Sequence, residues 1–177
     1  MHVDFSKNYF DLFGLAEKFD IDNAQLVSRF QELQKQLHPD KYASKPDAER
    51  RWSMQAASFV NEAYQTLGDD LKRAIYLLGM HGVSIDEETD TQMSPMFLME
   101  QMEYREALEM APDASDPYQA LDAVRKNLKS ATSDQLAAFE NACNQQSWGE
   151  ARTSVRQWQF LDKLKQEVRS AEERLDE

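Results

Sequence analysis

The sequence predicts an all-α protein, and three observations support this fold class. The 177 residues include only five glycines and five prolines, so few positions interrupt a helix. Apolar residues recur at steps of three and four along most of the chain, which is the period of one helix face. Long alternations of polar and apolar residues, which would indicate strands, are missing. A chain of this length can bury a core and form one or two domains.

The first element expected is a short helix that follows a lead-in over residues 1–8 and runs through Leu15. Asn8 or Ser6 is suited to cap its start, and Gly14 is suited to its exit. A longer helix then begins at Asp22, which we expect to act as N-cap, with Gln25 reaching back from the third helical position. Its apolar face is formed by Leu26, Phe30, Leu33 and Leu37.

The tripeptide His38-Pro39-Asp40 ends that helix, because proline disfavours the helical conformation of the residue before it. Pro46-Asp47 opens the next helix, whose apolar positions are Trp52, Ala56, Phe59, Val60, Ala63 and Leu67. Two helices of similar length joined by a short connection are most simply antiparallel neighbours. The tripeptide is therefore expected at the exposed tip of a helical hairpin.

A helix from about Leu71 to Met80 completes a first domain over residues 1–80. The acidic stretch 81–93 has few apolar residues, and we interpret it as a connector. We expect the 71–80 helix and this connector to pack against the second domain.

The second domain, residues 94–177, is predicted to be a three-helix bundle. Its first helix starts at Ser94-Pro95 and is stopped by Pro112, and its second starts at Asp116-Pro117 and runs toward Cys143. The pattern leaves open whether the second helix breaks near residues 132–134. The third follows a capping-box pattern over residues 147–150. Its apolar stripe consists of Ala151, Val155, Trp158, Leu161, Leu164, Val168, Ala171 and Leu175.

Charge and composition exclude several classes of partner. The net charge is −12, of which residues 1–80 carry −2 and residues 81–177 carry −10. An acidic surface repels phosphate backbones and anionic lipids, so we expect no nucleic acid and no membrane partner. The partner of the second domain is expected to be a protein, with basic groups.

No targeting or metal-binding pattern is present in the sequence. No stretch approaches the roughly eighteen apolar residues of a membrane span, and the N-terminal residues do not resemble a secretory signal. The single cysteine, Cys143, excludes an internal disulfide framework and a cysteine-built zinc or iron–sulfur site. We expect a cytoplasmic protein with no cofactor and no metal.

The helix from Met96 to Ala111 is predicted to be apolar on two sides. One arc, suited to the bundle core, holds Phe97, Tyr104, Ala107, Leu108 and Ala111. The other holds Leu98, Met99, Met102 and Met110, interleaved with Glu103, Glu106 and Glu109. This arc could be part of a wide stripe that touches two neighbouring helices. Buried glutamates would need partners, however, so we favour an exposed docking surface, which Phe160 is expected to extend.

Four segments of the first domain resemble a J-domain, in order and at the usual spacing. They are residues 9–15 (YFDLFGL), 30–41 (FQELQKQLHPDK), 61–67 (NEAYQTL) and 72–77 (KRAIYL). The resemblance implies that His38, Pro39 and Asp40 stimulate the ATPase of a DnaK-type chaperone. Arg29, Lys35 and Lys41 are the candidates for the basic surface that such a chaperone meets. Without the resemblance, His38 and Asp40 could be plain turn residues.

Two further segments, residues 97–103 (FLMEQME) and 156–164 (RQWQFLDKL), look like the C-terminal domain of the HscB-type J-proteins. This resemblance implies an adaptor that binds an IscU-type iron–sulfur scaffold and delivers it to an HscA-type chaperone. The scaffold-binding residues implied are Leu98, Met99, Met102, Glu103, Glu106 and Phe160. Two alternatives are a general J-protein that delivers other clients, and an enzyme that uses His38 as a general base. The second lacks a visible nucleophile or phosphate loop, so we expect no catalysis.

Overall fold

A computed structural model describes residues 3–85 and 94–176, and every regular element in these ranges is helical. The all-α prediction is confirmed. The chain divides into two compact units, Met1–Met80 and His81–Glu177. None of the helices in the described ranges combines the length and apolarity that a membrane span requires.

The first unit begins with a short helix, α1 (Tyr9–Phe13), whose ends follow the prediction. The side chain of Asn8 accepts a hydrogen bond from the backbone N–H of Asp11 at 2.9 Å. Gly14 ends the helix with a φ of 66°, a left-handed conformation that glycine adopts without a steric penalty.

The next helix, α2 (Asn23–Leu37), is capped by Asp22, which accepts from the backbone N–H of Gln25 at 3.0 Å. The predicted reciprocal bond from the Gln25 side chain to the start of α2 is wrong. Its amide Nε2 donates to the carbonyl of Gly14 at 2.7 Å. Gln25 therefore ties α2 to the end of α1, and this contact is not visible in the local sequence.

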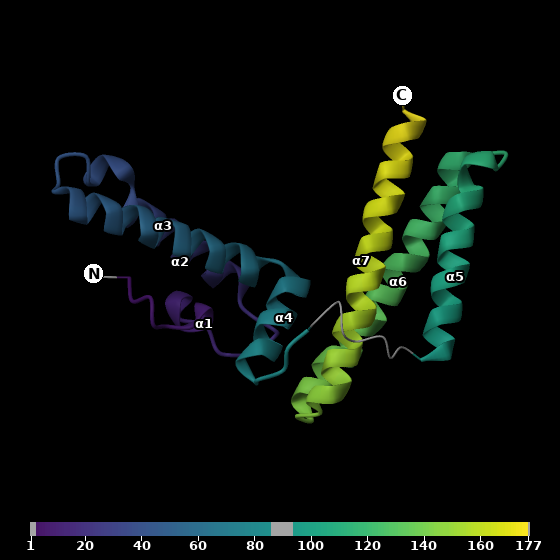
Figure 1. Ribbon diagram of the computed structural model, residues 1–177, viewed down its shortest axis with the longest axis horizontal. Coiled ribbons are helices and arrows are strands. Elements are labelled where there is room, and N and C mark those ends of the chain that lie inside the picture. Colours follow the sequence, from purple (N-terminus) through teal and green to yellow (C-terminus); the bar gives the residue numbers. More distant parts are fainter. Residues whose placement is uncertain (1–2, 86–93, 177) are drawn as a thin grey trace. The chain divides into compact units, whose positions relative to one another are not determined.

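The hairpin is completed by α3 (Asp47–Gly68), which lies antiparallel beside α2 (Figure 1). Phe30 and Tyr64 stack across the hairpin with ring centroids 3.8 Å apart. The apolar side chains buried in this unit include Phe10, Phe13, Leu26, Leu37, Ala56, Val60, Ala63, Leu67, Ala74, Leu77 and Leu78. Burial of a Leu or Phe side chain contributes about 1.5–3 kcal/mol, so this core fixes the hairpin and its tip.

The last helix of the unit, α4 (Asp70–Met80), buries a charged residue that sequence reasoning did not single out. Arg73 is only 4% exposed. It donates hydrogen bonds to the carbonyls of Phe19 (2.9 Å) and Leu67 (2.5 Å) and to the Asp70 carboxylate (2.6 Å). Its guanidinium also lies 4.6 Å from the centroid of the Phe19 ring. These bonds offset the cost of burying the charge and join distant parts of the chain.

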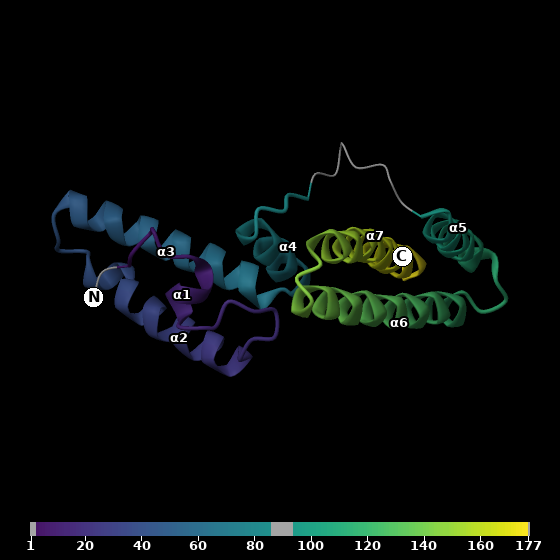
Figure 2. The same ribbon diagram turned by 90° about the horizontal axis from the view of Figure 1, so that it is seen from below.

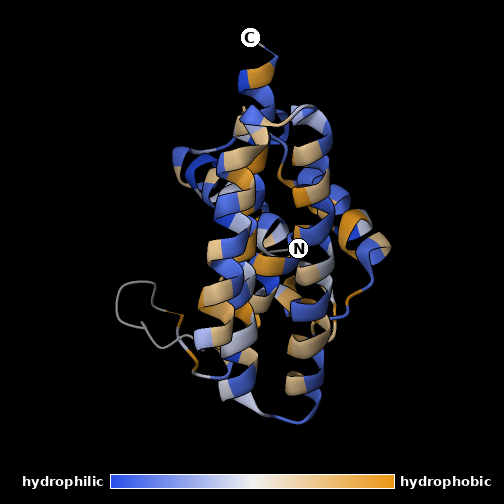
Figure 3. Cartoon of the chain, turned by 90° about the vertical axis from the view of Figure 1, so that its right-hand side faces the viewer, coloured by the Kyte–Doolittle hydropathy of each residue, from blue (hydrophilic) through white to orange (hydrophobic). Residues whose placement is uncertain are grey.

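The second unit is a three-helix bundle of α5 (Pro95–Met110), α6 (Pro117–Asn144) and α7 (Trp148–Leu175). A short 3-10 turn, η2 (Ala111–Asp113), separates α5 from α6. The antiparallel pair α6 and α7 runs side by side along its length, with α5 against both (Figures 1 and 2). One core cluster of the bundle consists of Ala111, Leu121, Val124, Leu128, Leu161, Leu164 and Val168. Hydrophobic and hydrophilic residues alternate along the long helices, as expected of amphipathic helices (Figure 3).

Two of the three predicted starts in the bundle have the expected caps. Ser94 accepts from the backbone N–H of Phe97, and Asp116 accepts from that of Gln119. The capping box at the start of α7 is wrong, because the Ser147 side chain makes no capping hydrogen bond. The preceding residue, Gln146, has a φ of 57°, so a turn in the left-handed region leads into α7 instead.

The question of a break in the second bundle helix is resolved, because α6 is continuous through residues 132–134. Thr132 Oγ1 donates to the Leu128 carbonyl at 2.7 Å, and Ser133 Oγ donates to the Lys129 carbonyl at 3.1 Å. These hydroxyls bond to the preceding turn of the helix and do not end it.

Most of the predicted acidic connector, residues 86–93, lies outside the described residues. The described part, residues 81–85, contacts the start of α7. His81 stacks on Trp148 with ring centroids 3.9 Å apart, and Arg152 Nε donates to the Ser84 carbonyl at 2.9 Å.

Candidate functional sites at the hairpin tip and on helix α5

The first candidate site, His38, Pro39 and Asp40, is hereafter called the tip. His38 follows the last residue of α2, and Pro39 starts a short 3-10 turn, η1 (Pro39–Lys41). The backbone N–H of Asp40 donates to His38 Nδ1 at 3.3 Å. Because Nδ1 accepts, a neutral imidazole carries its proton on Nε2, which leaves a donor for a partner.

Both polar side chains of the tip face solvent. Their exposed fractions are 59% for His38 and 90% for Asp40, and His38 Nδ1 lies 3.5 Å from Asp40 Oδ2. A proline ring and a backbone hydrogen bond thus hold a carboxylate in the open. The arrangement can recognise a cationic group on another protein, with little conformational freedom left to lose.

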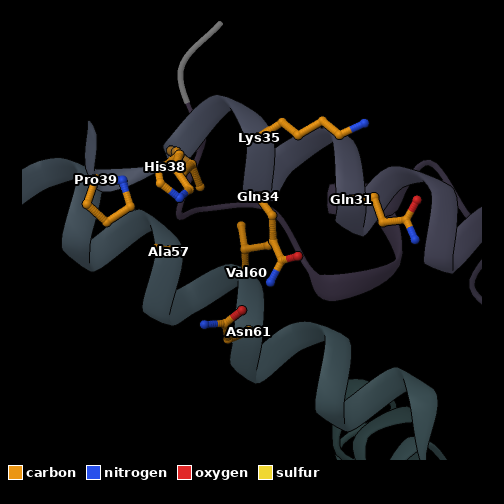
Figure 4. A pocket seen from close by; sticks show the side chains of 9 residues that line it. Gln31, Gln34, Lys35, His38, Pro39, Ala57, Val60 and Asn61 are labelled. Atoms are coloured by element: carbon orange, nitrogen blue, oxygen red, sulfur yellow. The ribbon is translucent and has the colours of Figure 1, made fainter. Parts of the chain in front are cut away.

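A cleft of about 380 Å³ lies beside the tip, between α2 and α3. Its lining residues are Gln31, Gln34, Lys35, Leu37, His38, Pro39, Ala57, Val60 and Asn61. Figure 4 shows that Gln31, Gln34 and Lys35 come from α2, whereas Ala57, Val60 and Asn61 come from α3. The sequence reasoning identified His38, Pro39 and Lys35 but not the amides of Gln31, Gln34 and Asn61, which no short motif singles out.

The three predicted basic residues do not have equal surroundings. Arg29 forms an ion pair with Glu32 at 2.9 Å, so part of its charge is neutralised. Lys35 and Lys41 are exposed and form no ion pair within the described part of the chain. Lys35 also lines the cleft, which places it beside His38.

The groups near His38 in the described part of the chain are the Asp40 carboxylate and the side chains that line the cleft. Among the described residues, no group of three or more His, Cys, Asp and Glu side chains is placed to hold a metal ion. The groups that share the cleft with His38 are amides, apolar side chains and one lysine.

The second candidate site lies on α5. Leu98, Met99 and Met102 are 45%, 63% and 71% exposed. Glu103 and Glu106 follow them along the helix and are also exposed. These five residues are hereafter called the α5 face. The α5 face thus combines three large apolar side chains with two carboxylates.

The opposite side of α5 packs on the bundle. Phe97 is buried, and Tyr104 and Leu108 are partly buried against the core. The prediction that Ala107 belongs to this packed side is wrong, because Ala107 is exposed. The half-buried residue there is Gln101, one turn from Phe97, so the packed stripe is narrower than predicted.

Phe160 does not lie in the open like the α5 face. It is partly buried against the bundle core. Its ring meets Phe97 edge-on with centroids 5.8 Å apart, and the Arg105 guanidinium lies 5.6 Å from its centroid. Arg105 also approaches Glu167 at 3.8 Å. Phe160 therefore helps to join α7 to α5.

The electrostatic environment of α5 is acidic. Burial raises the pKa of the Tyr104 hydroxyl, and the carboxylates of Glu100, Glu103 and Asp134 raise it further.

Met96 and Met110 are also exposed near the two ends of the helix. Sequence reasoning did not include Met96, although its spacing of three from Met99 puts it on the same side of the helix.

Two family matches cover most of the chain. Residues 8–76 match the DnaJ domain, and residues 93–169 match the HSCB C-terminal oligomerisation domain. The co-chaperone protein HscB homolog of Aliivibrio fischeri strain MJ11 is 43% identical over 168 residues, which is 95% of this chain and 98% of that protein. The homolog of Vibrio atlanticus is 44% identical with the same coverage.

Solved structures agree with this similarity. The chaperone HscB from Vibrio cholerae superimposes with a TM-score of 0.88 at 42% identity, over 95% of this chain and 99% of that one. The human co-chaperone protein HscB gives a TM-score of 0.89 at 28% identity, over 97% of this chain and 85% of that one.

Proposed function

Because the chain belongs to the HscB family of J-domain co-chaperones, we propose that it couples an IscU-type iron–sulfur scaffold to an HscA-type chaperone. In this function the chain holds the scaffold, presents it to the chaperone and stimulates the chaperone's ATPase during iron–sulfur cluster maturation. ATP hydrolysis belongs to the partner.

The tip is the proposed chaperone contact. The Asp40 carboxylate is exposed on a rigid turn, so it can form a charge-assisted pair with an arginine of the ATPase. Lys35 and Lys41 bring positive charge to the same end of the hairpin, with a smaller share from Arg29. Complementary charge raises the rate of encounter more than it raises affinity.

The α5 face is the proposed scaffold contact. The observation that carries this part is the joint exposure of Leu98, Met99 and Met102 on a helix whose other side is packed. Clustered large apolar side chains on the surface of a folded protein mark an interaction site. Methionine side chains adapt to irregular surfaces, and Glu103 and Glu106 favour a partner with basic groups.

The α5 face supplies most of the proposed scaffold site, and Phe160 supplies the rest in a different way. The Phe160 ring packs edge-on against the buried Phe97 of α5, and this contact helps to hold α5 in place. We therefore assign Phe160 a positioning role as well as the contact implied by the family resemblance.

Carrying both contacts on one chain makes the delivery efficient. A scaffold held on the α5 face meets a chaperone held at the tip at an effective concentration on the order of millimolar. A general J-protein for other clients would need a broad peptide-binding surface. The α5 face instead consists of five residues of one helix, two of them acidic, which supports a specific client.

The test is the ATPase rate of an HscA-type chaperone with the full chain, measured with an IscU-type scaffold and with a generic unfolded protein. We expect the scaffold to increase stimulation several-fold beyond that of the chain alone, and the unfolded protein to add nothing comparable. Equal increases from the two clients would support the general J-protein instead.

A further inference from the structure

We propose that Met99 and Met102 form a reversible oxidation site, at which a peroxide converts the two thioethers to sulfoxides and so releases the scaffold from the α5 face. This inference rests on the proposed scaffold contact. It adds regulation by peroxides, which would weaken the scaffold contact on the α5 face and leave the chaperone contact at the tip unchanged.

The two side chains are accessible to a small oxidant. Oxidation of methionine follows solvent exposure, and both thioethers lie on the open side of α5. The single cysteine is a poor competitor for peroxide. Cys143 is half-buried, and burial raises the pKa of its thiol to about 11, so little reactive thiolate exists near neutral pH.

The chemical step needs only the thioether and a peroxide. The O–O bond of hydrogen peroxide breaks, one oxygen forms an S–O bond with the methionine sulfur, and the other leaves as water. Sulfur is oxidised by two electrons and the peroxide is reduced by two. Methionine sulfoxide reductases reverse the modification, one enzyme for each sulfoxide epimer.

The surroundings of these methionines make the oxidised form unsuited to docking. A sulfoxide oxygen accepts hydrogen bonds, but the neighbouring Glu103 and Glu106 carboxylates are also acceptors. The one cation on α5, Arg105, lies over the Phe160 ring and beside Glu167. Among the described residues, the α5 face supplies no donor of its own to a sulfoxide, so oxidation replaces an apolar thioether with a polar group that costs more to remove from water when a client covers it.

The first unit holds a matched control. Met54 on α3 is 71% exposed, equal to Met102, and it lies neither at the tip nor in the cleft beside it. It should oxidise to a similar extent without effect on either proposed contact. A general effect of peroxide on the protein is thereby separated from an effect at the α5 face.

The experiment treats the full chain with hydrogen peroxide, locates sulfoxides by peptide mass spectrometry and measures the Kd for an IscU-type scaffold. Each variant is compared with its own untreated form. We expect oxidation to weaken wild-type binding by about tenfold or more. The Met54→Leu variant should show the same loss, and the Met99→Leu/Met102→Leu double variant should show almost none. Sulfoxide reductases should restore wild-type binding.

Three results would overturn the inference, and they are distinguishable. Unchanged affinity of wild-type chain that carries sulfoxides at residues 99 and 102 would exclude the switch while leaving the scaffold contact intact. Resistance of both residues to peroxide that oxidises Met54 would exclude the oxidation site. Absence of scaffold binding by the untreated chain would reject the proposed function, and the inference with it.

Discussion

The tip and the α5 face are two recognition surfaces built on opposite principles. At the tip, a helix end, a proline and a backbone hydrogen bond fix the positions of two polar side chains. On α5, the helix fixes only the Cα positions, and long thioether side chains supply the surface. The tip has a defined geometry and adapts little to a partner. The α5 face has a less defined geometry and adapts more. A single change should therefore disable the tip, whereas loss at the α5 face should accumulate over several residues.

The largest effect is expected at the tip. We predict that His38→Gln abolishes stimulation of the chaperone ATPase, because the longer, flexible glutamine side chain does not hold an acceptor where the imidazole Nδ1 accepts from the Asp40 N–H, nor a ring N–H for the partner. Scaffold binding should be unchanged. His81→Gln changes another exposed histidine, outside the tip, and should retain stimulation. Full stimulation by His38→Gln would show that backbone geometry alone is sufficient there.

The next effect concerns the α5 face. Replacement of Leu98, Met99 and Met102 together by alanine should weaken scaffold binding by about a hundredfold, since each side chain loses only part of the 1.5–3 kcal/mol of a fully buried one. Stimulation of the chaperone without client should be unaffected. Titration calorimetry measures the change, with Met54→Ala as the exposed control. If one of the three single changes accounted for the whole loss, the contrast with the tip would fail.

A third prediction concerns the frame that holds the tip. Arg73→Met removes three hydrogen bonds and leaves the Phe19 and Leu67 carbonyls without that donor, so it should destabilise the first unit by about 2–4 kcal/mol. Urea unfolding of the full chain, followed by NMR signals of each unit, provides the measurement. The neighbouring exposed residue gives the control, because Lys72→Met should change stability by less than about 0.5 kcal/mol.

Sequence reasoning succeeded where one local rule decides the structure. Asp22, Ser94 and Asp116 cap helices as predicted, because a short acceptor side chain before a helix has a nearby N–H to bind. The continuous α6 could not be decided, because Thr132 and Ser133 can bond within a helix or end one.

It failed where a distant partner competes for a side chain. Gln25 bonds to the end of α1 instead of its own helix start, and Arg73 bonds to Phe19, 54 residues away. On α5, the arc of exposed methionines was predicted from spacing. Ala107 is exposed and Gln101 is half-buried because of where α6 and α7 lie against α5, and a helical wheel of α5 alone does not contain those positions.

The smallest predicted effect is on the rate of association with the chaperone, and it comes from a change of charge near the tip. Glu32→Gln releases Arg29 from its ion pair, so association with the chaperone should accelerate by about twofold at low salt and return to the wild-type rate at high salt. Stopped-flow mixing over a range of salt concentrations tests this. Glu173→Gln makes the same change in net charge on an exposed part of α7 and should leave the rate unchanged.

The claim that both surfaces must reside on one molecule has the most direct test. An equimolar mixture of the His38→Gln variant and the Leu98/Met99/Met102 alanine variant contains one intact copy of each surface, on separate full-length chains. We expect the scaffold-dependent part of the chaperone ATPase rate to be lost in this mixture, because the scaffold is held by a chain that cannot trigger the chaperone. A rate equal to that of the wild-type chain would show that the two surfaces act independently and would contradict the account.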